Sequence, residues 1–321
     1  MRCISAIAAP LIVIFMALAF APAPAQAFER RVLDSVVSVL PRWPGHAAGG
    51  QPQVSPGTEP EGSAVAIRPG GYLVTALHVI ERALDITIRL PDGRHRPAEV
   101  VGRDPATDLA VLKIAADLPV LEDAPELELG APVCAVGNQF GLGLSVTCGV
   151  ISALNRSGTG FNPVEDFIQT DATVNPGASG GALVDGQGRL AGILSAIFTK
   201  ESDADIGINF AASMTLVRRV VDDLIAHGRV IRPRSGLRVA DLSRAERGQL
   251  VGARVVAVVP GGAAEGAGVK PGDLITEIAG RRVRRASDIT AAIYLQRPGG
   301  RVPVKIERDG TLRTLELELP P

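Results

Sequence analysis

The sequence has few aromatic residues and no excess of charge of either sign. Aromatic residues make up 3% of the 321 positions, so the hydrophobic cores must consist mainly of Val, Leu, Ile and Ala. The 33 basic and 34 acidic residues give a formal net charge of −1. Nucleic-acid binding needs clustered positive charge, so this balance argues against a nucleic-acid partner. The arginine-rich run at residues 281–285 is interpreted as a solvated turn.

Cysteine is also scarce, with three in the chain. Cys3 lies in the N-terminal segment, whereas Cys134 and Cys148 flank a glycine-rich loop between two strand-like runs. If these two runs pair as a hairpin, the sulfur atoms lie close enough for a disulfide in an oxidising compartment. A pair of adjacent buried thiols is the alternative, and the sequence leaves both open. We expect neither a metal ion nor a cofactor.

The first 27 residues have the pattern of an export signal. Arg2 supplies a positive charge, residues 4–20 are almost wholly apolar, and Ala25-Gln26-Ala27 is a small-residue cleavage pattern. Cleavage after Ala27 would release the protein into an extracytoplasmic compartment, expected to be the bacterial periplasm. The alternative is an uncleaved membrane anchor, because the apolar stretch approaches spanning length. The prolines that follow the stretch favour cleavage.

Glycines surround one serine in the run TDATVNPGASGG, residues 170–181. A serine hydroxyl becomes reactive where a sharp backbone turn exposes it and directs amide N–H groups at the reacting carbonyl. The glycines at 177, 180 and 181 permit such a turn, because glycine adopts backbone angles closed to other residues. Ser179 is therefore a candidate nucleophile. The alternative is a surface turn in which this serine only hydrogen-bonds locally.

Two further residues complete a catalytic pattern. Of the four histidines, only His78 follows a clear strand pattern, in GYLVTALHVI. Asp108 stands directly before the apolar run LAVLKI, where the alternative role of an acid is to end a turn. Taken alone, each of these residues is more often structural. Together with Ser179 they give the chain order His, Asp, Ser of a chymotrypsin-type triad.

Short strand-like runs alternate with turn signals from residue 62 to about residue 212. This rhythm predicts a mostly β fold with paired antiparallel barrels rather than a parallel sheet with crossover helices. Residues 214–226 have helical spacing, and Gly228 ends the predicted helix. The length leaves room for a second domain with its own core.

Several motifs in one order resemble the HtrA/Deg serine proteases over roughly residues 61–319. They are GYLVTALHVI, TDLAVLK, GNQFGLG and FIQTDATVNPGASGG, and residues 206–211 resemble the last barrel strand of that family. The resemblance implies a chymotrypsin-like double β-barrel protease domain followed by a smaller PDZ domain. The domains we expect are a signal peptide (1–27), an N-terminal segment and loop (28–60), a protease domain (61–227), a linker (228–235) and a PDZ domain (236–321).

The resemblance also implies an activity, a serine endopeptidase that cleaves unfolded or mislocalised envelope proteins. His78 would act as general base, Asp108 would orient its imidazole, and Ser179 would attack the peptide carbonyl. The backbone N–H groups of Gly177 and Ser179 would stabilise the oxyanion. The alternative function is a non-catalytic peptide-binding or chaperone-like module that retains the protease fold.

Other family features carry over as expectations. An amphipathic segment at residues 28–40 would help protease domains form a homotrimer, residues 41–60 would be a loop, and the loops at 156–165 and 198–205 would control activity. The S1 pocket would admit small aliphatic residues and would be lined by Leu194, Ser195, Ala196 and Ile197.

Two positions near the site depart from the family pattern. Ala178 replaces the usual asparagine before the nucleophile, which removes a side chain able to steady the turn. We therefore expect low basal activity. Gln139 replaces a common proline and is expected to matter little. Neither change removes a catalytic atom.

Residues 252–280 resemble the core of a PDZ domain, a module that binds C-terminal peptides by strand addition. The carboxylate-binding loop falls at Arg234, Ser235, Gly236 and Leu237. Ser235 takes the place of an apolar residue there. This change argues against a preference for strongly apolar C-termini, and Arg234 would attract acidic ones. The alternative is a domain that only packs and spaces.

Overall fold

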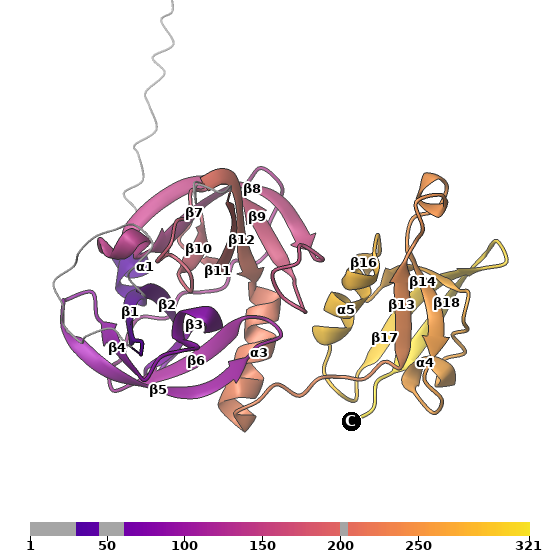
Figure 1. Cartoon of the computed structure of the whole chain (residues 1–321), viewed down its shortest axis with the longest axis horizontal. Helices are drawn as coiled ribbons and strands as arrows, with labels where there is room; N and C mark the ends of the chain where they lie inside the picture. Colours follow the sequence, from indigo (N-terminus) through magenta and orange to yellow (C-terminus); the bar gives the residue numbers. More distant parts are fainter. Residues whose placement is uncertain (1–29, 45–60, 200–204) are drawn as a thin grey trace, which may run out of the picture.

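The computed structural model describes residues 30–44, 61–199 and 205–321. In these ranges the chain forms two closed six-stranded barrels followed by a smaller six-stranded sheet domain (Figure 1). The predicted mostly β, double-barrel fold is therefore confirmed. The expected signal segment 1–27 and most of the expected loop 41–60 lie outside the described residues.

The first barrel has the strand order β1-β2-β3-β6-β5-β4. Its apolar side chains, among them Val37, Leu73 and Leu112, are fully buried inside it. The helix α1 (Arg30–Ser35) precedes it, and α2 (Leu77–Ile80) follows directly on β3. The strands are β1 (Val36–Arg42), β2 (Gly62–Arg68), β3 (Tyr72–Ala76), β4 (Asp85–Arg89), β5 (His95–Asp104) and β6 (Leu109–Ile114).

Two strands of this barrel were not expected. The segment 28–40, predicted to be one amphipathic stretch, contains α1 and then β1, which pairs with both β2 and β4. Its side chains are buried on consecutive positions, so the strand lacks the two-residue alternation that marks a half-exposed one. β5 begins at His95, shortly after the turn at residues 91–93. Its residues are mainly polar, so they lack the apolar pattern that predicts a strand.

The second barrel has the order β10-β11-β12-β9-β8-β7 and is followed in the chain by α3 (Met214–His227). Ser213 caps this helix by accepting a hydrogen bond from the Leu216 amide, and Gly228 ends it at φ 68°. The buried face of α3 packs on both barrels. The strands are β7 (Pro132–Gly137), β8 (Ser145–Arg156), β9 (Phe167–Thr170), β10 (Ala182–Asp185), β11 (Leu190–Thr199) and β12 (Asp205–Ser213), with the short helix η1 (Gln139–Gly141) between β7 and β8.

The third unit is a sheet of order β13-β14-β15-β17-β18, with β16 paired to β15 (Figure 1). Its own apolar core includes Val255, Ile275 and Val304, all fully or almost fully buried. The elements are β13 (Leu237–Asp241), η2 (Glu246–Gly248), β14 (Ala253–Val258), α4 (Ala263–Gly266), β15 (Leu274–Ile278), β16 (Arg281–Arg282), α5 (Ala286–Tyr294), β17 (Arg301–Arg308) and β18 (Thr311–Glu318).

Polar contacts join the third unit to the barrels. The Tyr294 hydroxyl donates to the buried Asp104 carboxylate, just before the Asp108 turn. Burial and the Asp104 carboxylate raise the pKa of Tyr294, so its phenol keeps the proton that it donates. Arg281 pairs with buried Asp166 at 2.5 Å, and the Ser157 hydroxyl donates to an Asp288 carboxylate oxygen at 2.5 Å. The unit therefore packs against the two barrels through specific hydrogen bonds.

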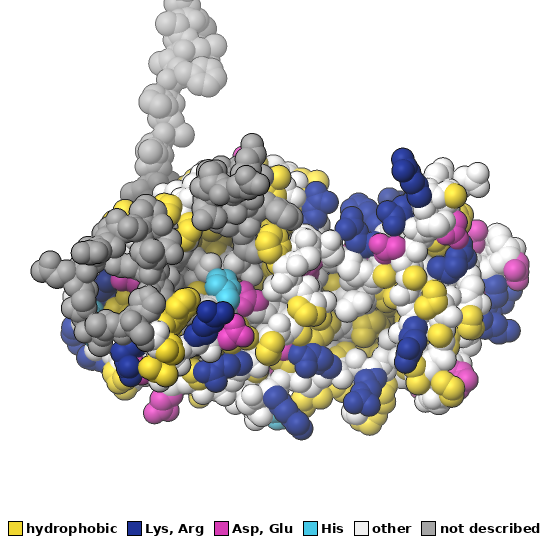
Figure 2. Space-filling view, viewed as in Figure 1, with side chains coloured by type: hydrophobic (Ala, Val, Ile, Leu, Met, Phe, Trp, Pro, Cys, Tyr) yellow, Lys and Arg dark blue, Asp and Glu magenta, His cyan; other side chains and the backbone are white. Residues whose placement is uncertain are grey.

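Charged side chains of both signs are interspersed over the face shown in Figure 2, in keeping with the near-zero net charge. In residues 30–44, 61–199 and 205–321, no helix is long and apolar enough to span a membrane.

A disulfide joins Cys134 of β7 to Cys148 of β8. The two residues are direct cross-strand partners in the antiparallel β7–β8 pair. The hairpin arrangement that the sequence left open is thus present, and the structure takes the disulfide alternative.

We expect this disulfide to stabilise the protein by constraining the unfolded chain. Cys134→Ala combined with Cys148→Ala should lower the free energy of unfolding by about 3 kcal/mol, the value typical of a loop of this size. Urea unfolding of the two proteins measures the difference. Thiol titration of denatured, unreduced protein lacking residues 1–27 checks the premise, and finding two reactive thiols would contradict it.

Candidate active site

The pairing of β3 with β6 brings His78 and Asp108 together. In this antiparallel pair Ala76 lies opposite Leu109, so the residues just beyond each strand end meet. The chain turns into α2 after Ala76, and the Leu77 amide donates to the Asp108 carbonyl at 2.8 Å. Strand register, which the buried side chains specify, therefore sets this contact.

Asp108 holds His78 through both carboxylate oxygens. Oδ1 accepts from the His78 backbone amide at 2.8 Å, and Oδ2 lies 2.6 Å from the imidazole Nδ1. Asp108 adopts φ 56°, a left-handed conformation that aspartate tolerates better than most residues. The Asp108 side chain is 16% exposed and that of His78 is 49% exposed. The imidazole is thus fixed on one side and open to solvent on the other.

Ser179 lies in the loop between β9 and β10, pressed against the first barrel. Its carbonyl accepts from the Ser63 amide of β2 at 2.9 Å. Gly180, at φ 83°, packs so closely that an added Cβ would lie 2.9 Å from the Ala76 amide. The nucleophile loop therefore abuts the end of β3, two residues before His78. In the described residues the Ser179 hydroxyl makes no hydrogen bond to His78, a contact that is often long in unliganded enzymes.

Four consecutive carbonyls of this loop are hydrogen-bonded. Those of residues 176, 177, 178 and 179 accept from Phe140 N, Ser63 Oγ, Gly181 N and Ser63 N at 2.7, 2.8, 2.8 and 2.9 Å. Carbonyl and N–H point in opposite directions across a trans peptide, so the Gly177 and Ser179 amides point away from these partners. Neither amide donates to a protein acceptor in the described part of the chain. Both are free to receive an oxyanion.

The two departures from the family pattern have visible consequences here. Ala178 is fully buried in an apolar cluster, and its turn is held by backbone bonds from Ala178 N to Asn175 O and from Gly181 N to Ala178 O. Gln139 was expected to matter little. Its side-chain oxygen accepts from the Asn175 amide group at 2.7 Å, so it holds the nucleophile loop.

The expected S1 residues lie on β11 beside that loop. Leu194 exchanges backbone hydrogen bonds with Gly180 and Gly181 at 2.7 and 2.8 Å. Ser195 sits at a register shift in the β11–β12 pair and is buried, with no hydrogen-bond partner for its hydroxyl in the described residues. The side chains of Ala196 and Ile197 lie outside the described set, as does most of the expected control loop 198–205.

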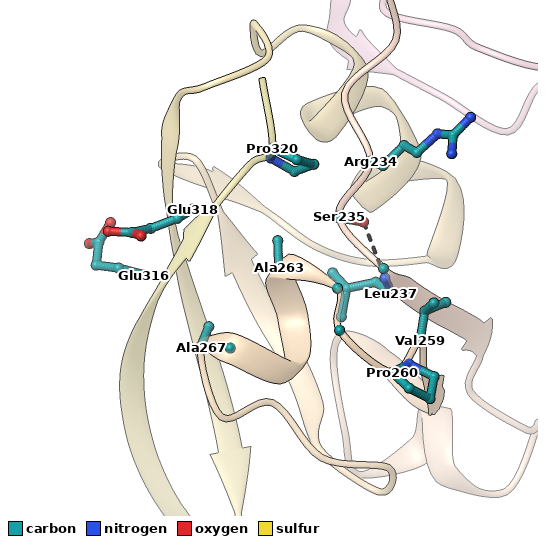
Figure 3. A pocket seen from close by; sticks show the side chains of 14 residues that line it. Arg234, Ser235, Leu237, Val259, Pro260, Ala263, Ala267, Glu316, Glu318 and Pro320 are labelled. Carbon is teal, nitrogen blue, oxygen red and sulfur yellow. Dashed lines mark hydrogen bonds between the residues drawn. The ribbon is translucent and has the colours of Figure 1, made fainter.

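The expected carboxylate loop of the third unit borders a groove of about 1050 Å³ (Figure 3). Gly236 adopts φ 74°, and the Leu237 amide donates to the Ser235 hydroxyl at 3.3 Å. Apolar side chains line the middle of the groove. Arg234 lies on one side, and two acidic residues of β18 lie on the other: Glu316 and Glu318. The groove thus carries both signs of charge.

Sequence reasoning did not identify Ser63, and it assigned no role to Asn138 in the GNQFGLG motif. Ser63 is fully buried, and its hydroxyl lies between Asn138 and Gly177. Its only signal is a polar residue at the start of the otherwise apolar run GSAVAI. Such a residue commonly marks a strand end, so the pattern gave no reason to single it out.

Two family descriptions match the chain. A trypsin-like peptidase domain matches residues 62–193, and a PDZ domain matches residues 204–319. The second match begins one residue before β12, well before β13. The fold and these two matches thus define a trypsin-like peptidase domain with a PDZ domain.

Curated relatives give the family. The chain is 36% identical over 325 residues to the periplasmic pH-dependent serine endoprotease DegQ of Escherichia coli, covering 93% of this chain and 70% of that protein. It is 41% identical over 264 residues to a probable periplasmic serine endoprotease, DegP-like, of Chlamydia trachomatis, covering 80% and 52%. The chain therefore belongs to the HtrA/Deg family of serine proteases.

A solved structure described as the HtrA-type protease AlgW with a tripeptide is similar in fold. It has a TM-score of 0.70 and 38% identity, covering 90% of this chain and 94% of that one. A serine endoprotease from Yersinia pestis gives a TM-score of 0.60 and 34% identity, covering 91% and 95%. The present chain spans about half the length of the DegP-named relatives that it matches.

Proposed function

We propose that the protein is a serine endopeptidase that cleaves unfolded or mislocalised polypeptides in the periplasm. The observation that carries the proposal is the Asp108–His78 hydrogen bond of 2.6 Å. It lies beside the Ser179 loop, in which the N–H groups of Gly177 and Ser179 donate to no acceptor in the described residues. The curated relatives are periplasmic serine endoproteases, which supports both the activity and the location. We propose the same domain boundaries that the sequence predicted, with β1 added to the protease domain because it pairs within the first barrel.

In the proposed mechanism, Ser179 Oγ attacks the substrate carbonyl carbon while His78 Nε2 takes the hydroxyl proton. Asp108 keeps Nδ1 protonated and stabilises the imidazolium without accepting the proton. The amides of Gly177 and Ser179 receive the negative charge on the carbonyl oxygen. His78 then protonates the leaving amine. Water, deprotonated by His78, releases the acyl group and restores the enzyme.

Unstructured β-casein tests the activity, and a fluorophosphonate probe tests the nucleophile. We expect purified protein to degrade the casein and the probe to form a covalent adduct at Ser179, located by peptide mass spectrometry. Tight binding of casein without cleavage or labelling would favour the chaperone-like alternative.

We further propose that the PDZ domain binds C-terminal peptides. β13 pairs only with β14 in the described residues, so its other edge is free to accept an added strand. Similar AlgW structures are described with a tripeptide and with a decapeptide. The family resemblance also supports a homotrimer built through the N-terminal segment, and sedimentation equilibrium would measure its mass.

The charge at Arg234 should set part of the peptide preference. In full-length Ser179→Ala protein, which cannot cleave the ligand, peptides with acidic C-terminal residues should bind more tightly than strongly apolar ones. Arg234→Ala should weaken the acidic peptides by about 2- to 5-fold, the range for exposed charge pairs. Fluorescence anisotropy measures both, with Arg244→Ala as a control outside the groove. Absence of any binder at high micromolar concentration would mean that the domain only packs and spaces.

A further inference from the structure

One fully buried hydroxyl, that of Ser63, connects three parts of the site. Ser63 lies near the start of β2, in the first barrel, whereas the nucleophile loop belongs to the second. Its Oγ donates to the Gly177 carbonyl at 2.8 Å and accepts from the Asn138 amide at 2.8 Å. Its backbone amide donates to the Ser179 carbonyl at 2.9 Å. A single residue thus holds the carbonyls of both residues whose amides form the proposed oxyanion hole.

These contacts restrict the peptides on either side of the Ser179 amide. The hydroxyl of Ser63 fixes the peptide between residues 177 and 178, and its amide fixes the peptide between residues 179 and 180. A peptide that is held at its carbonyl cannot rotate without breaking that bond. The Ser179 N–H therefore lies between two peptide planes, each of which is hydrogen-bonded to Ser63 of β2.

The same hydroxyl positions the segment that orients the Gly177 N–H. Phe140 N donates to the Pro176 carbonyl at 2.7 Å, which directs the Gly177 N–H the opposite way. Phe140 follows two residues after Asn138, whose amide is bound to Ser63. The two segments are in close contact, since a Cβ on Gly177 would lie 2.3 Å from the Asn138 carbonyl oxygen. Ser63 is the bridge between them.

A second polar link reaches this bridge from the first barrel. The Asn138 side-chain amide donates to the Glu61 carboxylate at 2.5 Å, and its side-chain oxygen accepts from the Gly143 amide at 2.8 Å. Asn138 is fully buried. Buried polar groups that are fully hydrogen-bonded make a rigid, specific arrangement. The loop that carries the nucleophile therefore rests on a polar network anchored in the opposite barrel.

We propose that Ser63 is a positioning residue for the oxyanion hole, an inference that rests on the proposed endopeptidase function. It touches neither the substrate nor the reacting atoms. It keeps the Gly177 and Ser179 amides directed at the developing oxyanion, and it does so from the barrel that supplies His78 and Asp108. The nucleophile, the base and the oxyanion donors are thereby all held in place by the first barrel.

Ser63→Ala tests the proposal, because it removes the hydroxyl and leaves the triad in place. With an internally quenched peptide that has Val at the cleaved position, we expect kcat to fall by about 10- to 100-fold. The upper end of this range approaches the fall in kcat that follows removal of one oxyanion donor. KM should change by less than about 3-fold. The pH profile of kcat/KM should match that of the parent protein, since the His78–Asp108 hydrogen bond is untouched. Fluorophosphonate labelling of Ser179 should slow in parallel with kcat.

Two variants separate positioning from stability. Ser63→Thr keeps a hydroxyl and should retain kcat within about 5-fold of the parent. Ser35→Ala removes another fully buried serine hydroxyl, one that donates to the Arg31 carbonyl at 2.8 Å in α1. It should lower stability in urea by a similar amount, about 1 kcal/mol, without changing kcat. If Ser63→Ala does not fold, Ser63→Cys fills nearly the same volume with a weak donor and serves in its place.

The outcomes are distinct. Parental kcat and labelling in Ser63→Ala, with lowered stability alone, would make Ser63 purely structural and overturn the inference. A Ser63→Thr variant with a kcat as low as that of Ser63→Ala would also overturn the inference. A parent protein that neither cleaves the peptide nor reacts with the probe would instead refute the proposed endopeptidase function and this inference with it.

Discussion

Ser179→Ala is expected to lower kcat/KM for a casein-derived peptide by about 10⁶-fold, the scale reported for loss of a serine nucleophile. The variant retains His78, Asp108 and the loop amides but has no atom able to form the acyl-enzyme. The loop should keep its shape, because the bonds that hold residues 176–179 are made by backbone carbonyls. Peptide binding should therefore persist. Hydrolysis rates and anisotropy measure the two effects.

The matched control for this experiment is Ser243→Ala, at an exposed serine in the PDZ domain far along the chain from the catalytic loop. It should cleave casein at the parental rate. Equal degradation by Ser179→Ala and by the parent protein would show that a contaminating protease causes the cleavage, and it would remove the support for Ser179 as nucleophile.

Asp108→Asn should lower kcat by about 10⁴-fold. The asparagine side chain can fill the same space, but its amide group facing Nδ1 would favour the wrong imidazole tautomer. The Nε2 atom would then carry a proton and could not accept one from Ser179. Loss of the carboxylate charge also removes the stabilisation of the imidazolium. Steady-state kinetics with the quenched peptide measures the change.

Asp92→Asn provides the comparison, since Asp92 is an exposed turn residue paired with Arg94. This variant should match the parent in kcat. If Asp108→Asn also matched the parent, the hydrogen bond between Asp108 and His78 would have no catalytic role, and the proposed mechanism would be wrong at that step.

Much of this architecture was predictable because local patterns agree with the fold. The alternation of strands and turns predicted the barrels, and the helical spacing over residues 214–226 predicted α3, which extends one residue further. His78 follows one recognisable apolar run, and Asp108 directly precedes another. Their contact follows from pairing those two runs, which the resemblance to HtrA/Deg proteases implied.

The unpredicted features depend on contacts between residues far apart in the chain. β1 has no alternation because its side chains are buried on both faces. Ser63 and Asn138 are 75 positions apart, and each resembles an ordinary turn or strand-end residue. Their role is visible only once the two barrels meet. Polar groups in such a junction have no periodicity, so pattern analysis cannot identify them.

Ala178 shows how a departure from a family pattern depends on context. Its replacement of asparagine led us to expect a less steady turn. In the structure the methyl group is fully buried among apolar side chains, and backbone bonds close the turn on both sides of it. The measured kcat of the parent protein will show whether basal activity is low.

The β3–β6 pairing has a consequence for how the protein loses activity. Because Leu77 and His78 are hydrogen-bonded to Asp108, the residue just before β6, the backbones of His78 and Asp108 cannot part by movement of a loop alone. These backbones separate only when β3 and β6 come apart. The backbone contact between His78 and Asp108 should therefore persist until the first barrel unfolds. We expect gradual inactivation by heat to begin in the glycine-rich turn that carries Ser179.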